Sequence, residues 1–351
     1  GIGMTQATIR NGRRMSTAFC YLDPARSRSN LKVQANALTE ALTFEGRRCT
    51  GVRYRIGGQV REAMARREVV VSAGSVNSPQ LLELSGIGQA DRLKTLGIDV
   101  RHELKGVGEN LRDHYSPRMK WSVPPELGLT YNDKGRGLGL VWQALKYALT
   151  DKGLLGLPAA PIRAYVRTRE GLEAPDAAIS WIPFLANENF QLHKDSGITA
   201  ITHVLRSDST GSIHVASNDP GKPPAIRFNF LSAQSDRDIL LESMRITRRI
   251  MNAGPMKDVA RDEMAPGVDV TSDDDLLEWV KHNAETTYHP VGTCKMGNDP
   301  MAVVDDQLKV HGIEALRVAD ASIMPTLTSG NTNAPSIMIG EKASRMVLAA
   351  A

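Results

Sequence analysis

A histidine in a constrained turn is the first candidate for chemistry. His289 lies between Tyr288 and Pro290, and a proline biases the preceding residue toward an extended backbone. Imidazole changes its charge near neutral pH and can act as a base, although most single histidines are structural. A second polar segment further along the chain contains Asp320 and Asn331. Either segment by itself indicates little, but the pair of segments is specific.

Two short apolar strands are expected to position these groups. The first, Val69 to Ser72, ends in Ala73 and Gly74, which are small enough for a ligand to approach the backbone. A tight turn from strand to helix explains the glycine equally well. A helix is predicted to follow, with Ser78 as its cap and Pro79 in its first turn.

The second strand, Ala315 to Ala319, ends at Asp320. That carboxylate could accept hydrogen bonds from a cofactor, or it could cap the turn at Ala321. A helix is predicted from Ser336 to Leu348, and its N-terminal amides would favour negative charge.

Alternating patterns divide the rest of the chain into two regions. The first 65 residues contain a predicted strand at 30–34 and a β-meander at 38–44, 50–56 and 60–65. From about Tyr115 the composition changes, and the pattern becomes that of antiparallel strands and amphipathic helices. The predicted strands of this second region are 119–123, 177–184, 198–205, 211–216 and 225–229, and its main helices are 138–149 and 236–251. The segment Val303 to Lys309 is expected to be strand-like, with a turn at the charged pair Asp305-Asp306.

The composition is that of a globular protein and excludes several classes. The chain has 351 residues, 41% of them hydrophobic and 23% charged, with a net charge of +4. Because the charge is not concentrated in blocks, no nucleic-acid partner is predicted. No apolar run approaches the roughly 18 residues of a membrane span. Three cysteines without a CxxC pair favour reduced thiols in an intracellular setting, and no metal site is predicted.

Several motifs occur in the order found in one enzyme family. They are Arg10–Arg14, Val69–Leu82, Leu84–Gly88, Gly106–His114, Thr286–Gly297 and Leu316–Pro335. Together they resemble the glucose-methanol-choline (GMC) oxidoreductases, the flavoenzymes that oxidise alcohols with FAD. The tail is most similar to the choline-dehydrogenase-like branch.

The resemblance implies an oxidoreductase that acts on the CH–OH group of a small-molecule alcohol and transfers hydride to flavin. His289 matches the general base, and Asn331 matches the partner that holds the alcohol oxygen. The implied flavin contacts are Ala73, Gly74, Asp320, Ala321, Thr332 and Asn333. Electrons would pass to oxygen or to a quinone-like acceptor.

The implied fold is mixed α/β and has two domains. Residues 1–116 and 289–351 would form part of a Rossmann-like FAD-binding domain. Residues 117–288 would form an antiparallel-sheet substrate domain. A cytoplasmic location is expected, with peripheral membrane association left open.

The glycine-rich turn that binds the FAD pyrophosphate is not found in the sequence. Each Gly-x-Gly lacks a third glycine at the required spacing, and residue 1 is not a methionine. We therefore expect the C-terminal portion of a longer enzyme, which would not retain FAD by itself. Two alternatives remain open: a non-redox lyase on the same scaffold, similar to hydroxynitrile lyases, and an inactive fragment.

Overall fold

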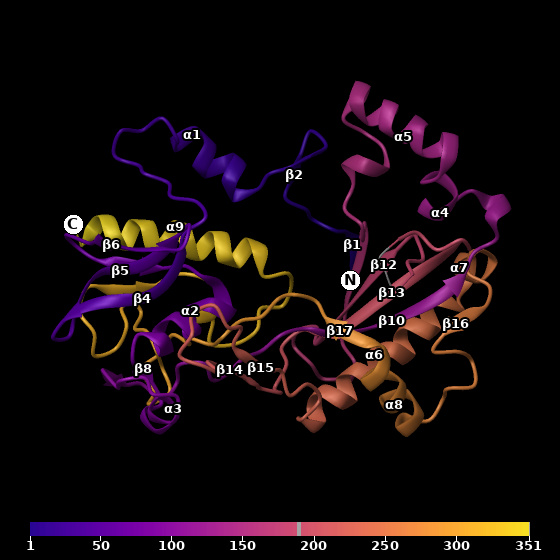
Figure 1. Ribbon diagram of the computed structural model, residues 1–351. Helices are drawn as coiled ribbons and strands as arrows, with labels where there is room; N and C mark the ends of the chain where they lie inside the picture. The colour runs from indigo at the N-terminus through magenta and orange to yellow at the C-terminus, as the bar shows by residue number, and fades with distance from the viewer. Residues whose placement is uncertain (188–190, 351) are drawn as a thin grey trace. The chain divides into compact units, whose positions relative to one another are not determined.

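A computed structural model describes residues 1–187 and 191–350 of the chain (Figure 1). The chain forms two compact units, each built from several segments. Unit 1 consists of Gly1–Leu31, Tyr115–Leu205 and Gln234–Thr287, and unit 2 consists of Lys32–His114, Arg206–Ala233 and Tyr288–Ala351. Helices and strands occur in both units, which confirms the predicted mixed α/β fold class.

Unit 1 contains an antiparallel sheet. Its order is β1 (Ile2–Met4), β11 (Ile162–Val166), β12 (Ala177–Ile182), β13 (Gly197–Val204), β10 (Tyr115–Ser122) and β16 (Glu263–Ala265), and β17 (Ala284–Thr286) also pairs with β10. In the central strand β12, the five consecutive buried residues are apolar except for one serine. Such a continuous apolar stretch is typical of a strand that is covered on both faces of the sheet. The predicted antiparallel sheet is confirmed.

Helix α6 (Gln234–Met251) packs against β12 and β13 (Figure 1). Its buried face includes Leu240 and Met244, which recur at helical spacing. In the middle of this face Ser243 exchanges a hydroxyl hydrogen bond of 2.8 Å with Thr202 of β13, so the buried polar atoms are satisfied. The other elements of unit 1 are β2 (Ile9–Arg10), β3 (Arg13–Arg14), η1 (Ala18–Leu22), α1 (Asp23–Ala25), η2 (Pro125–Leu127), α4 (Tyr131–Lys134), α5 (Gly137–Thr150), η3 (Leu154–Gly156), α7 (Gly254–Val259) and α8 (Asp273–Asn283).

Unit 2 contains the predicted meander as β4 (Leu38–Glu45), β5 (Arg48–Ile56) and β6 (Gln59–Met64). Gly57 and Gly58 form the turn between β5 and β6, and both have positive φ, which glycine adopts without steric cost. The strand predicted at 30–34 is wrong, since these residues form no strand and lie exposed. The segment alternates between polar and apolar residues, but it has no neighbouring strand to pair with and no core against which its apolar residues could pack.

The two strands predicted to position the site pair with each other. In β7 (Val69–Val71) and β18 (Leu316–Val318) the residues pair in parallel, with Val69 opposite Leu316 and Val71 opposite Val318. A single apolar cluster surrounds them and includes residues of β4, β5 and the C-terminal helix α9 (Asn333–Ala349). This is the core of unit 2.

Helix α2 (Gly74–Leu84) begins four residues before the predicted cap at Ser78. Pro79 therefore lies inside the helix, where it has no N–H to donate to the carbonyl of Ser75. The hydroxyl of Thr293 donates to that carbonyl at 2.7 Å instead. A contact from a distant segment thus allows the helix to continue through a proline.

The remaining elements of unit 2 are short. They are β8 (Ile87–Gly88), α3 (Ala90–Thr95), β9 (His102–Glu103), β14 (Ser212–His214), β15 (Ala225–Arg227) and η4 (Ala321–Ile323). The strand character predicted for Val303 to Lys309 is wrong, because this segment makes only isolated bridges. The turn expected at Asp305-Asp306 is confirmed, since the N–H of Leu308 donates to the carbonyl of Asp305 at 3.0 Å. The apolar residues there are buried in the core of unit 2 by turns instead of by a sheet.

The compact units divide the chain differently from the predicted domains in two places. Residues 1–31 belong to unit 1, although they were placed with the first domain, and residues 206–233 belong to unit 2. Elsewhere the boundaries at Tyr115 and Tyr288 lie within two residues of the predicted ones.

Candidate functional site

Two histidines and an asparagine meet in unit 2. The Nε2 atom of His289 lies 3.0 Å from Nδ2 of Asn331, although 42 positions separate them in the sequence. The Nδ1 atom of His289 lies 3.1 Å from Nδ1 of His114, and the two rings are nearly perpendicular. His114 is buried, His289 is half-buried and Asn331 is exposed. The structure therefore forms a chain of three polar groups that runs from the interior to the surface.

A short antiparallel bridge sets this geometry. The backbone N–H groups of Arg112 and Val291 each donate to the carbonyl of the other residue, at 3.1 and 2.9 Å. This places residues 113 and 114 opposite residues 289 and 290. Asp113 then accepts the backbone N–H of His289 at 3.0 Å.

The residue before the histidine has an unusual backbone. Tyr288 has φ of 61°, a left-handed conformation that a bulky side chain rarely adopts. The hydrogen bond from His289 to Asp113 holds the chain just after this residue. Strain of this kind is found where the surrounding contacts fix a functional side chain.

The hydrogen-bond roles determine the state of the neutral ring. The amide Nδ2 of Asn331 can only donate, so Nε2 of His289 is the acceptor and carries a lone pair. In the neutral ring the proton is then on Nδ1, which donates to Nδ1 of His114. An unprotonated Nε2 at the exposed end of the chain is suited to accept a proton from a bound hydroxyl.

A second cluster forms where β7 and β18 end. Oδ2 of Asp320 accepts hydrogen bonds from the N–H of Gly74 at 2.9 Å and from Oγ of Ser78 at 2.6 Å. Oδ1 accepts the N–H of Ser322 at 2.8 Å, which caps η4. The carboxylate thus joins the start of α2 to the end of β18. A carboxylate can accept about four hydrogen bonds, and these three leave one acceptor position for a ligand.

The other predicted cofactor residues surround these two clusters. Ala73 is exposed, Ala321 is half-buried, and no atom lies within 4 Å of the position that a Cβ on Gly74 would occupy. Thr332 occupies the N-cap position of α9 without a side-chain capping bond and is 8% exposed, while Asn333 is exposed in the first turn. The helix begins three residues before the predicted Ser336, since Pro335 is compatible with a first turn.

The segment 290–294 connects the two clusters. Oγ of Ser75 donates to the carbonyl of Pro290 at 2.6 Å, and the N–H of Cys294 donates to the carbonyl of Ser322 at 2.9 Å. Burial, and secondarily the charge of Asp320, raises the pKa of the Cys294 thiol well above its ordinary value. Cys294 is therefore a neutral packing residue, not a nucleophile.

A buried network fixes the segment that carries His114. The ring of His214 lies 2.7 Å from Oε1 of Glu83 through Nδ1 and 3.1 Å from Oε1 of Glu109 through Nε2. The N–H of Val215 also donates to Glu83, at 2.7 Å. Next to Glu109, Gly108 has φ of 82°, and a Cβ there would lie 2.2 Å from a backbone oxygen. His214 is thus a structural histidine, as expected for the scattered histidines of the sequence.

Two family profiles match the sequence, and both are described as GMC oxidoreductase. One matches residues 1–116 and the other residues 207–340, which together cover most of the chain and contain all the site residues above. The chain belongs to the GMC oxidoreductase family. Members of this family are FAD-dependent enzymes, and the resemblance inferred from the motifs is confirmed.

Relatives of this GMC oxidoreductase include choline dehydrogenases. The oxygen-dependent choline dehydrogenase of Chromohalobacter salexigens is 41% identical over 350 residues, which is 94% of this chain and 59% of the relative. That of Cronobacter sakazakii is 40% identical over 356 residues, again 94% of this chain and 59% of the relative. The chain thus spans about 59% of the length of these relatives.

Solved structures give the same fold. A formate oxidase superposes with a TM-score of 0.92 at 25% identity over 99% of this GMC oxidoreductase and 65% of the oxidase. A pyridoxine 4-oxidase from Mesorbium loti superposes with a TM-score of 0.84 at 25% identity over 98% of this chain and 64% of the oxidase. Among the described residues, no helix is both long and apolar enough to cross a bilayer.

His114 and Asp113 are the residues of this site that the sequence did not assign to it. They lie in the Gly106–His114 motif, for which no contact with His289 was expected from the sequence. The signal that could have found them is the bridge between Arg112 and Val291, which is a tertiary contact and leaves no local pattern.

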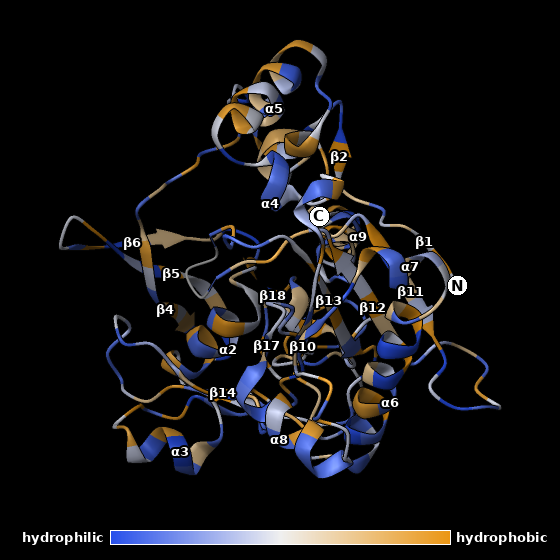
Figure 2. Ribbon diagram, turned by 90° about the vertical axis from the view of Figure 1, so that its right-hand side faces the viewer, coloured by the Kyte–Doolittle hydropathy of each residue, from blue (hydrophilic) through white to orange (hydrophobic). Residues whose placement is uncertain are grey.

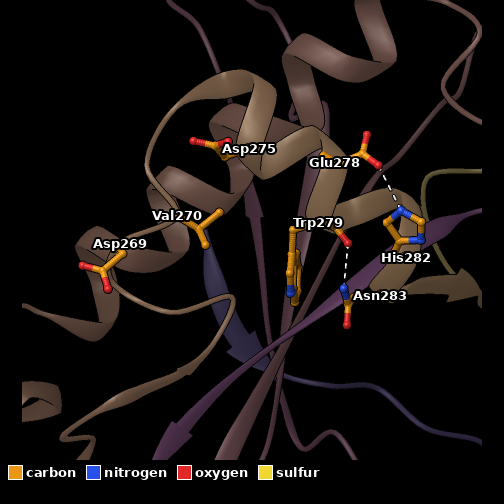
Figure 3. A pocket seen from close by; sticks show the side chains of 7 residues that line it. All are labelled: Asp269, Val270, Asp275, Glu278, Trp279, His282 and Asn283. Carbon is orange, nitrogen blue, oxygen red and sulfur yellow. Dashed lines mark hydrogen bonds and ion pairs between the residues drawn. The ribbon is translucent and has the colours of Figure 1, made fainter.

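A separate hollow of about 400 Å³ lies along α8 in unit 1 (Figure 3). Trp279 and Val270 form its apolar wall. The carboxylate of Glu278 already accepts hydrogen bonds from Lys281 and His282, both at 2.9 Å. The hollow contains no paired base and oxygen-binding group, so the candidate site remains the one around His289.

Proposed function

We propose that this chain carries the alcohol-oxidising site of an FAD-dependent oxidoreductase that acts on CH–OH groups. The observation that supports this most directly is the position of His289 between Asn331 and His114. An alcohol loses hydride from carbon more readily as its hydroxyl proton leaves, so the site needs a base and a hydrogen-bond donor at the same oxygen. His289 and Asn331 supply these two groups.

The residues at the ends of β7 and β18 fit a flavin cofactor. Gly74 leaves open space at its Cβ position, Asp320 retains one acceptor position, and both lie where ligands bind in α/β folds, at the carboxyl ends of parallel strands. Ala73, Gly74, Asp320, Ala321, Thr332 and Asn333 would hold FAD in this proposal. When bound, FAD supplies the two-electron acceptor that the amino acids lack.

Each residue of the pair has a distinct task. When an alcohol binds, its hydroxyl replaces Asn331 at the lone pair of Nε2. Nε2 of His289 then accepts the hydroxyl proton, and the N–H of Asn331 that it released donates a hydrogen bond to the oxygen as negative charge develops there. His114 accepts from Nδ1 of His289 and keeps the lone pair on Nε2, so it is a positioning residue. In this proposal unit 2 binds the flavin and unit 1 contributes to substrate binding.

Anaerobic reduction by alcohols tests the proposal, in an FAD-loaded chain that spans the full length of its relatives. Bleaching of the flavin absorbance is expected for an oxidoreductase. A lyase would cleave its substrate without bleaching, and an inactive fragment would give neither result. A panel that includes choline and aryl alcohols would define the substrate, and repetition with oxygen or a quinone would identify the electron acceptor.

Variants assign the roles. His289→Ala should slow flavin reduction by about 10² to 10⁴-fold, the usual contribution of a positioned base. Asn331→Ala should slow it by about 10 to 10³-fold, and the double variant should lose less than the product because both groups act on one oxygen. His282→Ala, a surface histidine of α8, is the matched control. Wild-type reduction rates in His289→Ala would refute the assignment.

The three cysteines, Cys20, Cys49 and Cys294, are free thiols, which supports the proposal that the protein works in the cytoplasm.

A further inference from the structure

Helix α5 of unit 1 turns its polar face toward the protein and its apolar face toward solvent. None of its 14 residues is buried. Gln143 and Tyr147 face the protein, where Oε1 of Gln143 accepts the N–H of Leu154 at 3.2 Å and the Tyr147 hydroxyl donates to the carbonyl of Gly12 at 3.1 Å. The apolar side chains of α5 therefore point away from the unit that carries it.

The outward face is large and continuous. Leu138 is 88% exposed, Leu149 74%, Val141 63%, Trp142 61% and Leu145 48%. In both views α5 stands apart from the sheet of unit 1, and in Figure 2 much of its ribbon has the orange of hydrophobic residues. Contiguous exposed apolar surface of this kind marks a binding surface.

The width of the apolar arc indicates what covers it. At about 100° per residue, the apolar residues 138, 140–142, 144, 145, 148 and 149 cover roughly 200° of the helix circumference. A partner helix covers a stripe of only about 100°. A bilayer surface covers about half of a helix that lies in its interfacial region, as amphipathic anchors do.

The basic residues around α5 also favour a bilayer surface as the partner. Between residues 134 and 152 there are four basic residues and one acidic residue, Asp151. The guanidinium of Arg136 donates to the backbone carbonyls of residues 192–194, so the cations available to a partner are Lys134, Lys146 and Lys152. Lys146 lies at the border of the apolar arc, and the others flank the two ends of the helix. Basic side chains in these positions can reach phosphate groups while their stems stay in contact with apolar surface.

We propose that α5 is an interfacial helix that inserts its apolar face into a bilayer containing anionic phospholipids. Trp142 would lie at the level of the headgroups, where tryptophan is favoured. The helix lies in the plane of the membrane and does not cross it. This proposal does not depend on the proposed oxidoreductase activity, because no residue of α5 belongs to that site.

Co-sedimentation of the 351-residue protein with phospholipid vesicles tests the proposal. Binding should be at least tenfold stronger to vesicles of phosphatidylcholine with phosphatidylglycerol than to phosphatidylcholine alone, and it should weaken with salt. Brominated lipids should quench the fluorescence of Trp142. Trp142→Phe should still bind the vesicles but lose most of this quenching, because Trp121 and Trp181 are buried and Trp279 is half-buried on α8.

Matched variants separate the apolar face from the charges. Leu138→Ser with Leu145→Ser should reduce vesicle binding at least tenfold without changing the far-UV circular dichroism, since neither side chain is buried. Val60→Ser with Met64→Ser, two exposed apolar residues of β6, is the control and should bind normally.

Lys146→Glu with Lys152→Glu should weaken binding to anionic vesicles by about fivefold or more per lysine, with little change for neutral ones. Equal binding to both vesicle types, or an equal loss in the β6 control, would overturn the proposal. Light scattering that shows a dimer, and a monomer after the leucine substitutions, would identify a second copy as the occupant instead. A chain that spans the full length of its relatives and does not bind vesicles would show that protein covers α5.

Discussion

Replacement of Glu83 by alanine should destabilise unit 2 selectively. Glu83 is fully buried, and its carboxylate accepts from the ring of His214 and from the N–H of Val215, both at 2.7 Å. Alanine removes the acceptor but leaves both donors in the interior. Each buried donor that loses its acceptor costs about 1–3 kcal/mol, so the loss for the two donors together should be about 4 kcal/mol, because neither can reach water.

The matched variant is Glu109→Ala on the other side of the ring. Glu109 also faces His214, at 3.1 Å, but a third of its side chain is exposed. Water can replace it, so we expect a loss of at most about 1 kcal/mol. Glu83→Gln keeps the shape and a carbonyl acceptor and should recover roughly half of the loss.

Each unit has its own reporter for this measurement. The four tryptophans, Trp121, Trp142, Trp181 and Trp279, all lie in unit 1, and the buried thiols of Cys49 and Cys294 lie in unit 2. In a urea titration, thiol reactivity therefore follows unit 2 and tryptophan emission follows unit 1. With a slope of about 2 kcal/mol per molar urea, Glu83→Ala should lower the thiol midpoint by about 2 M.

Two results would refute the reasoning. If Glu83→Ala and Glu109→Ala shift the thiol midpoint equally, burial is not the source of the cost. If tryptophan emission shifts as much as thiol reactivity in Glu83→Ala, the effect is not confined to unit 2.

Two further predictions concern the helix cap at Thr130 and the buried thiols. Thr130→Ala should destabilise unit 1 by about 0.5–2 kcal/mol in the tryptophan-detected titration, because Thr130 and Asp133 form a reciprocal capping box. Burial tends to raise the pKa of Asp133, but hydrogen bonds from a serine and from Thr130 outweigh burial, and the pKa is lowered. The stabilisation by the Asp133 carboxylate should therefore be full above the ordinary pKa of 3.8 and be lost as the pH falls through the lower pKa of the folded state. A Thr130→Ala penalty that stayed constant to about pH 2 would contradict this. Iodoacetamide at pH 8 should label the exposed Cys20 and leave Cys294 unmodified until urea unfolds unit 2, as mass spectrometry of the peptides can determine.

Local patterns predicted the elements that depend on local interactions. The meander at β4–β6 is such a case, because its alternation and the Gly57-Gly58 turn both lie within the hairpin. Helix α6 is another, since its apolar residues recur at helical spacing in the sequence. The exposed segment 30–34 shows the limit: alternation predicts a strand only where a neighbouring strand is available to pair with it.

Tertiary contacts determine the features that local sequence patterns did not predict. The sequence indicated that α2 starts at Ser78, but the hydroxyl of Thr293 allows the helix to include Pro79. Asp320 was assigned two alternative roles, and the structure shows the cap together with the contact to Gly74, while its role toward FAD stays a prediction. His289 and Asn331 were placed together by resemblance alone, since no local pattern connects them.

The parallel pairing of β7 with β18 has a consequence for the order of folding during synthesis. Val71 leaves the ribosome 245 positions before Leu316 (316 minus 71), and at about 5–20 residues per second this delay is on the order of 10–50 s. Every segment of unit 1 is complete by residue 287, 29 positions before Leu316 (316 minus 287), so at the same rate about 1.5–6 s remain for unit 1 to fold before the second strand appears. Unit 2 must wait with its first strand unpaired, so nascent chains stalled near residue 300 should contain a folded unit 1 and depend on chaperones to protect β7.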